Sequence, residues 1–85
     1  MTKSILIIGA GPGIGLSVAR KFGEQGWSIV LSARNPERLA ALTADLSARG
    51  ITVQTILADA SDRTALRAAI AEADRITGGL TAIHY

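Results

Sequence analysis

The sequence has no cysteine, two prolines, and one residue each of phenylalanine, tryptophan and tyrosine. The absence of cysteine excludes disulfide bonds and thiolate metal sites. The single histidine, His84, has no second histidine or cysteine to complete a metal site, so we expect it to be neither a metal ligand nor a catalytic base. No apolar run is long enough for a signal peptide or a membrane span, which leads us to expect a cytoplasmic protein that does not bind membranes.

The excess of positive over negative charge is also small. Nine Lys/Arg against seven Asp/Glu give a formal net charge of +2, and no aromatic residues interleave with the basic ones. A nucleic-acid-binding surface requires clustered basic residues, whereas these are spread along the chain. We therefore interpret them as solvated helix residues and expect no nucleic-acid partner. The hydrophobic share of 48% is typical of a folded domain.

Short apolar, β-branched runs alternate with amphipathic helical segments along the 85 residues. Strands are expected at 5–8, 28–32, 51–57 and 80–85. The helices between them are expected to bury Ile14, Val18 and Phe22, then Leu39, Leu42 and Leu46, then Leu66, Ala69, Ile70, Ala73 and Ile76. Asn35 and Ser61 are the expected N-caps, and glycines end each helix. This β-α-β-α-β-α-β alternation predicts an α/β fold with a parallel sheet and, through right-handed crossovers, the strand order 3-2-1-4.

The segment after the first strand contains four glycines in seven residues, Gly9-Ala10-Gly11-Pro12-Gly13-Ile14-Gly15. Two registers of a phosphate-binding loop fit it, Gly9/Gly11/Gly15 and Gly9/Gly13/Gly15. Glycine permits a tight turn and close approach of phosphate oxygens, and the following helix N-terminus offers N–H groups to an anion. The loop therefore predicts a site for the pyrophosphate of a dinucleotide. The alternative is a purely structural strand-to-helix turn.

The spacing Gly9-x-x-x-Gly13-Ile14-Gly15 resembles that of the short-chain dehydrogenase/reductase family. The resemblance extends along the chain, through the segments 31–35, 57–62 and 79–83. It implies that residues 1–85 are the N-terminal part of an NAD(P)-binding, Rossmann-type doubly wound domain. It also implies hydride transfer between a nicotinamide cofactor and a small-molecule carbonyl/alcohol substrate, in a protein that is a homo-oligomer (dimer or tetramer) when complete. Ile8 departs from the family, which usually has Thr there, and Pro12 replaces a basic or small polar residue of many NADP-using members.

The resemblance also implies roles for individual residues. Gly9, Gly13 and Gly15 would line the pyrophosphate together with the backbone N–H of Ile14, in a loop that includes Gly11 and Pro12. Asp59 would accept a hydrogen bond from the adenine amino group, and Ala60 would donate one through its backbone. Asp59 could instead be a turn residue that supports a Ser61 cap. The family's catalytic Ser and Tyr-x-x-x-Lys have no counterpart in these residues, so we expect the catalytic part to be absent and assign no catalytic residue.

The end of the second strand predicts the choice of cofactor. NAD-dependent enzymes place an acid there for the ribose 2′-OH, whereas this chain has Ala33 followed by Arg34. A guanidinium pairs well with a 2′-phosphate, so we expect NADP(H) as the cofactor. Asn35 could add a hydrogen bond, although its capping role competes. Arg38 is a second candidate, but its helix position favours a solvated residue, and a solvated loop residue is also the alternative for Arg34.

Three functions remain open at this stage. The first is an NADP(H)-dependent short-chain dehydrogenase/reductase in which this stretch binds the adenosine-pyrophosphate end of the cofactor. The second is a non-catalytic dinucleotide-binding or sensor module that uses the same loop. The third is an inactive fragment, because the nicotinamide half of the site has no counterpart in these 85 residues.

Overall fold

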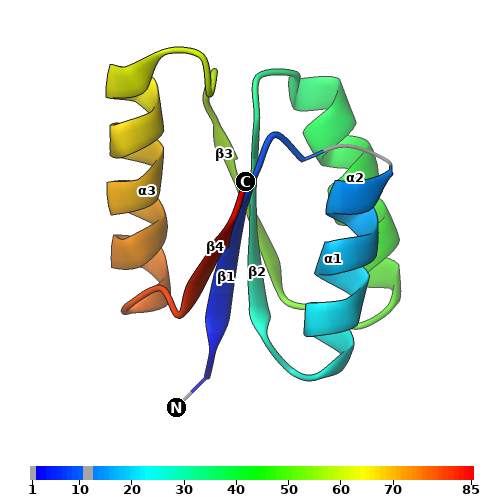
Figure 1. Ribbon diagram of the computed structural model, residues 1–85. Coiled ribbons are helices and arrows are strands. Elements are labelled where there is room, and N and C mark those ends of the chain that lie inside the picture. Colours follow the sequence, from blue (N-terminus) through cyan, green and yellow to red (C-terminus); the bar gives the residue numbers. More distant parts are fainter. Residues whose placement is uncertain (1, 11–12) are drawn as a thin grey trace.

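The structure is a computed structural model that describes residues 2–10 and 13–85. Strands and helices alternate strictly along the chain (Figure 1). The elements are β1 (Ser4–Ile8), α1 (Ile14–Glu24), β2 (Ser28–Ala33), α2 (Pro36–Ala48), β3 (Val53–Leu57), α3 (Arg63–Thr77) and β4 (Ala82–His84). None of the helices in these ranges is long and apolar enough to cross a membrane.

The four strands form one parallel sheet in the order β3-β2-β1-β4. Helices α1 and α2 cover one face of this sheet and α3 covers the other (Figure 1). The predicted α/β, doubly wound fold and its strand order 3-2-1-4 are therefore confirmed. Because the strands are parallel, the segments that follow β1, β2 and β3 all emerge at the same edge of the sheet.

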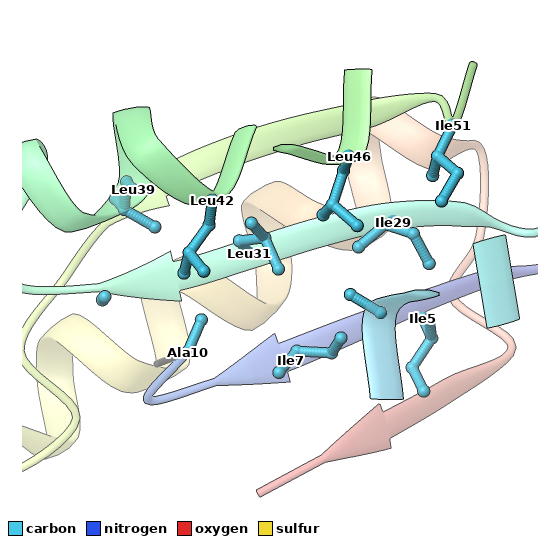
Figure 2. Close-up of a cluster of buried hydrophobic side chains, with 11 residues drawn as sticks. Ile5, Ile7, Ala10, Ile29, Leu31, Leu39, Leu42, Leu46 and Ile51 are labelled. Carbon is cyan, nitrogen blue, oxygen red and sulfur yellow. The ribbon is translucent and has the colours of Figure 1, made fainter. Parts of the chain in front are cut away.

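The two central strands supply the core because they are apolar on both faces. Every residue of β1 is buried, as a strand covered on both sides requires. One cluster joins β1 and β2 to α2, whose Leu39, Leu42 and Leu46 face Ile29 and Leu31 (Figure 2). The opposite face packs on α3 through a smaller cluster, whose buried members are Leu6, Ile8, Val30 and Ala73. The predicted inner faces of α2 and α3 are thus confirmed.

The helix caps match the prediction at α2 and differ at α3. Asn35 caps α2, since its Oδ1 accepts hydrogen bonds from the backbone N of Glu37 at 2.9 Å and of Arg38 at 3.1 Å. Helix α3 is capped by Asp62, so the prediction of Ser61 as the N-cap is wrong. Both residue types can cap a helix. Ser61 instead lies in a turn in which its backbone N and its Oγ donate hydrogen bonds to the side chain of Asp59.

The expected burial of Ile14 is also wrong. Ile14 is the first residue of α1 and is 76% exposed. The helix packs on the core through Leu16, Val18, Ala19 and Phe22. The helical spacing correctly identified Val18 and Phe22, but it continued the apolar stripe one turn too far, onto the side of the loop.

Several element ends also differ from the sequence prediction. Strand β3 begins at Val53 instead of Ile51, and β4 covers only 82–84 instead of 80–85. Ile51 is not in the strand because it terminates α2: its backbone N donates to the carbonyl of Leu46 at 3.1 Å, and Gly50 between them has φ +77°. This is the glycine-dependent helix ending in which the residue after the glycine also makes an apolar contact with the helix. Ile51 is accordingly buried in the α2 cluster.

Candidate functional site

A pocket of about 280 Å³ lies at the edge of the sheet where β1, β2 and β3 end. Ligands of open α/β sheets bind at this edge, beyond the carboxyl ends of the strands. The lining residues come from the segments at the ends of these three strands: Gly9, Ala10, Ala33, Arg34, Asn35, Arg38, Ala58, Asp59 and Ala60.

The pocket brings together five of the residues predicted from the sequence. Gly9, Arg34, Asn35, Asp59 and Ala60 all line it. Gly13, Ile14 and Gly15 are at the start of α1 and are not among its lining residues. Gly11 and Pro12 lie outside the described residues.

The turn that leaves β1 is tied to the neighbouring strand. Gly9 has φ +72°, a conformation that residues with a side chain rarely adopt. The backbone N atoms of Gly9 and Ala10 both donate to the carbonyl oxygen of Ser32 in β2, at 2.9 and 3.0 Å. A backbone acceptor therefore holds this turn, in a chain that has Ile8 where the family usually has Thr.

Helix α1 packs closely on this turn because residue 15 is glycine. A Cβ on Gly15 would lie 3.2 Å from the Cα of Ala10 and 3.5 Å from its carbonyl carbon. These are backbone atoms of a buried residue, which cannot move aside without moving the loop. Within the described residues no side chain caps α1 at Gly13, and its first turn contains no acid. The N–H groups of this helix end can therefore be offered to an anion.

Two arginines line the pocket on the α2 side. Ala33 ends β2 as a buried residue, and the exposed Arg34 follows it. Arg38, in the first turn of α2, lines the same pocket, although its helix position favoured a solvated residue. Asn35 uses its side-chain oxygen to cap α2, so the donor that it can offer to a ligand is its amide NH₂.

Asp59 lines the pocket from the segment that follows β3, and its orientation is fixed by Ser61. Its Oδ1 accepts from the Oγ of Ser61 at 2.7 Å and from the backbone N of Ser61 at 3.0 Å. These hydrogen bonds, together with the nearby charge of Arg34, hold the pKa of the Asp59 carboxyl below its usual value. The side chain is therefore an anion at neutral pH, and within residues 2–10 and 13–85 no donor is hydrogen-bonded to its Oδ2. The turn role considered as an alternative for Asp59 thus exists alongside its position in the pocket.

Strand register explains why Arg34 and Asp59 line the same pocket although 25 positions separate them in the sequence. Ala33 pairs with Leu57 at the ends of β2 and β3. The backbone N of Ala58 then donates to the carbonyl of Ala33 at 3.0 Å, which carries the pairing one step past the strands. The residues that follow, Arg34 and Asp59, consequently face the same hollow.

Two lining residues, Ala10 and Ala58, and the bracing carbonyl of Ser32 were not predicted from the sequence. The methyl group of alanine gives no chemical signal of a binding role. The available signal was their position immediately after or beside the predicted strand ends.

Two isolated residues have ordinary structural roles. Trp27, where α1 joins β2, packs edge-to-face on Phe22 with ring centroids 4.8 Å apart. His84 pairs with Ile7 in the sheet. In the described ranges, no group of three or more His, Asp or Glu side chains is arranged to hold a metal ion.

Comparison with known proteins identifies the family. The sequence profile described as short chain dehydrogenase matches residues 3–85. The chain belongs to the short-chain dehydrogenase family. It is 40% identical over 72 residues to sulfoacetaldehyde reductase 2 of Chromohalobacter salexigens, a match that covers 85% of this chain and 28% of that protein.

Solved structures of short-chain dehydrogenases show the same fold. A metagenomic short-chain oxidoreductase in complex with NADP superimposes with a TM-score of 0.87 and 30% identity, over 95% of this chain and 37% of the other. A variant of actinorhodin polyketide ketoreductase with NADPH superimposes with a TM-score of 0.90 and 26% identity, over 96% of this chain and 31% of the other. The chain therefore spans between 28% and 37% of the length of these relatives.

Proposed function

We propose that this chain binds the adenosine-pyrophosphate end of NADP(H) in an oxidoreductase that transfers hydride between the nicotinamide and a carbonyl/alcohol substrate. The observation that carries the proposal is that two arginines line the pocket while the strand beside them ends in an uncharged residue. Arg34 and Arg38 line one pocket with Gly9, and Ala33 takes the place of the acid that would bind a ribose 2′-OH.

The arginine side of the pocket suits a 2′-phosphate. A guanidinium forms paired, charge-assisted hydrogen bonds with phosphate oxygens. An acid at position 33 would repel the phosphate, whereas the buried methyl group of Ala33 does not. The amide NH₂ of Asn35 is a further donor on the same wall.

The remaining parts of the cofactor fit the other two segments. The pyrophosphate would lie on the N–H groups at the start of α1, between Gly9 and the turn formed by Gly13, Ile14 and Gly15, in the loop that also contains Gly11 and Pro12. The adenine amino group would donate to Oδ2 of Asp59, and the backbone N–H of Ala60 would donate to the ring.

Two comparisons support the choice of cofactor. The metagenomic oxidoreductase was solved with NADP and the ketoreductase with NADPH. The hydride-transfer step belongs to the family, and the proposal includes a homo-oligomeric, cytoplasmic protein acting on a small carbonyl/alcohol substrate.

The test uses two pairs of ligands, and the members of each pair differ only in the 2′-phosphate. Purified protein is titrated by calorimetry with adenosine 2′,5′-bisphosphate and with 5′-AMP, and then with NADPH and NADH. We expect the 2′-phosphorylated ligand of each pair to bind at least ~10-fold more tightly, equivalent to about 1.4 kcal/mol. Equal affinities within each pair would refute the assignment of NADP(H).

The Arg34→Ala variant tests whether this residue causes the preference for NADPH over NADH. It should remove most of the difference between NADPH and NADH while leaving NADH binding nearly unchanged, because only the 2′-phosphate loses a partner. Arg75→Ala is the matched control, since this arginine is near the carboxyl end of α3 and pairs with Glu72 away from the pocket. An equal loss in both variants would show that the effect is general electrostatics.

A further inference from the structure

Asp59 places a fixed negative charge in the pocket proposed to receive a 2′-phosphate. Asp59 lines the same pocket as Arg34 and Arg38. Asp59 cannot easily turn away, because Ser61 holds its Oδ1 through both the backbone N and the side-chain hydroxyl. The register of β2 and β3 holds the two walls together.

Arg34 and Asp59 also influence each other in the ligand-free protein. The charge of Arg34 contributes to the lowered pKa of the Asp59 carboxyl, so the two groups are within electrostatic range. No ion pair between them lies within 4.0 Å among the described residues. The carboxylate therefore attracts the guanidinium without binding it directly. A 2′-phosphate entering the pocket has to compete with that attraction and is itself repelled by the carboxylate.

We propose that Asp59 is a specificity-determining residue that limits the preference of this pocket for 2′-phosphorylated nucleotides, in opposition to Arg34. This inference deepens the proposed function and rests on it for the position of the 2′-phosphate. The adenine contact and the electrostatic effect are separate properties of the same side chain. Contact with adenine is common to both nucleotides, whereas the negative charge repels the one with the extra phosphate more strongly than the one without it.

The ratio of two affinities separates these properties. For wild type and Asp59→Asn, calorimetry gives the affinity for adenosine 2′,5′-bisphosphate divided by that for 5′-AMP. Asparagine retains a side-chain oxygen for the Ser61 turn and removes the charge. A change in the adenine contact cancels in the ratio, because both ligands carry the same base. We expect the ratio to rise several-fold in Asp59→Asn, and the rise to shrink as salt is increased.

Asp62→Asn is the matched control. It removes the same unit charge three residues away, outside the pocket lining, and asparagine caps α3 as well as aspartate does. The ratio should stay close to that of wild type in this variant. An unchanged ratio in Asp59→Asn, or an equal rise in Asp62→Asn, would overturn the inference.

The outcomes also separate this inference from the proposed function. If wild type distinguishes the two ligands and Asp59→Asn does so equally, the NADP(H) assignment stands and the role of Asp59 is wrong. If wild type does not distinguish them but Asp59→Asn does, the role of Asp59 stands and the wild-type preference for NADP(H) is wrong. If neither protein distinguishes them, both are wrong. Circular dichroism of each variant establishes that it is folded before titration.

Discussion

The close contact between Gly23 and Ile51 allows a strict test of how α1 packs against the segment that follows α2. Gly23 is in the last turn of α1, and a Cβ built on it would lie 2.5, 2.7 and 2.9 Å from three side-chain carbons of Ile51. Ile51 is 7% exposed and is anchored through its backbone to the end of α2. Replacement of Gly23 by alanine therefore forces two packed segments apart.

Two opposing terms set the magnitude for Gly23→Ala. Alanine is favoured over glycine inside a helix by about 1 kcal/mol. Overpacking a core typically costs about 1–3 kcal/mol, and three contacts this short place the cost near the upper end. We expect the free energy of unfolding to fall by about 2 kcal/mol, which in a domain of this size lowers Tm by roughly 10 °C.

Urea denaturation followed by circular dichroism measures this change, with the slope m showing whether unfolding remains two-state. Ile51→Ala removes all three contacted atoms and alone should cost about 2–4 kcal/mol. In the double variant the clash is absent and the helix preference of alanine remains, so its cost should be clearly less than the sum of the two single costs. Ser17→Ala, on the exposed side of α1, should change stability little. A Gly23→Ala variant as stable as wild type, or additive costs, would refute the packing.

Two further predictions concern helix α2, at its N-cap and near its carboxyl end. Asn35→Ala should destabilise the protein by about 1 kcal/mol, since α2 loses its N-cap, while Asn35→Asp should retain the stability; thermal unfolding of both variants provides the measurement, and equal losses would exclude a capping role. A hydrogen bond from Arg20, and to a smaller extent one from Arg49, lowers the pKa of the Asp45 carboxyl from 3.8. The contribution of this carboxylate to folding stability is therefore present above the ordinary pKa and is lost as the pH falls through the lowered pKa. The Tm of wild type minus that of Asp45→Asn should therefore decrease on acidification below about pH 4; a constant difference down to pH 2 would show that Asp45 does not titrate in this way.

The order and type of the elements could be predicted from the sequence because each local signal agrees with the fold. The apolar run 5–8 is a central strand buried on both faces, and the Leu39, Leu42 and Leu46 spacing is the buried stripe of α2. The misplaced start of β3 comes from a residue that serves two elements. Ile51 is apolar and β-branched like the strand after it, yet its backbone completes the preceding helix. Periodicity alone does not distinguish these roles.

The candidate site was predictable in its residue types but not in its layout. Arg34 and Asp59 were identified from their positions after two strands, and their proximity follows only from the register that pairs Ala33 with Leu57. The sequence position of Arg38 did not indicate that it lines the pocket. Its helix position is compatible with a solvated residue, and only the way α2 starts beside the pocket places it among the lining residues.

The three walls of the pocket differ in how they can change. The turn at Gly9 is fixed by backbone hydrogen bonds to Ser32, and Gly15 is held against the backbone of Ala10, so side-chain changes elsewhere leave this part intact. The arginine wall consists of exposed side chains that no described ion pair holds in place. Substitution at Arg34 therefore costs little folding free energy. Under the proposed function, cofactor preference can therefore change in this scaffold without a change in the glycine loop, through the balance of charge between the residues after β2 and Asp59 after β3.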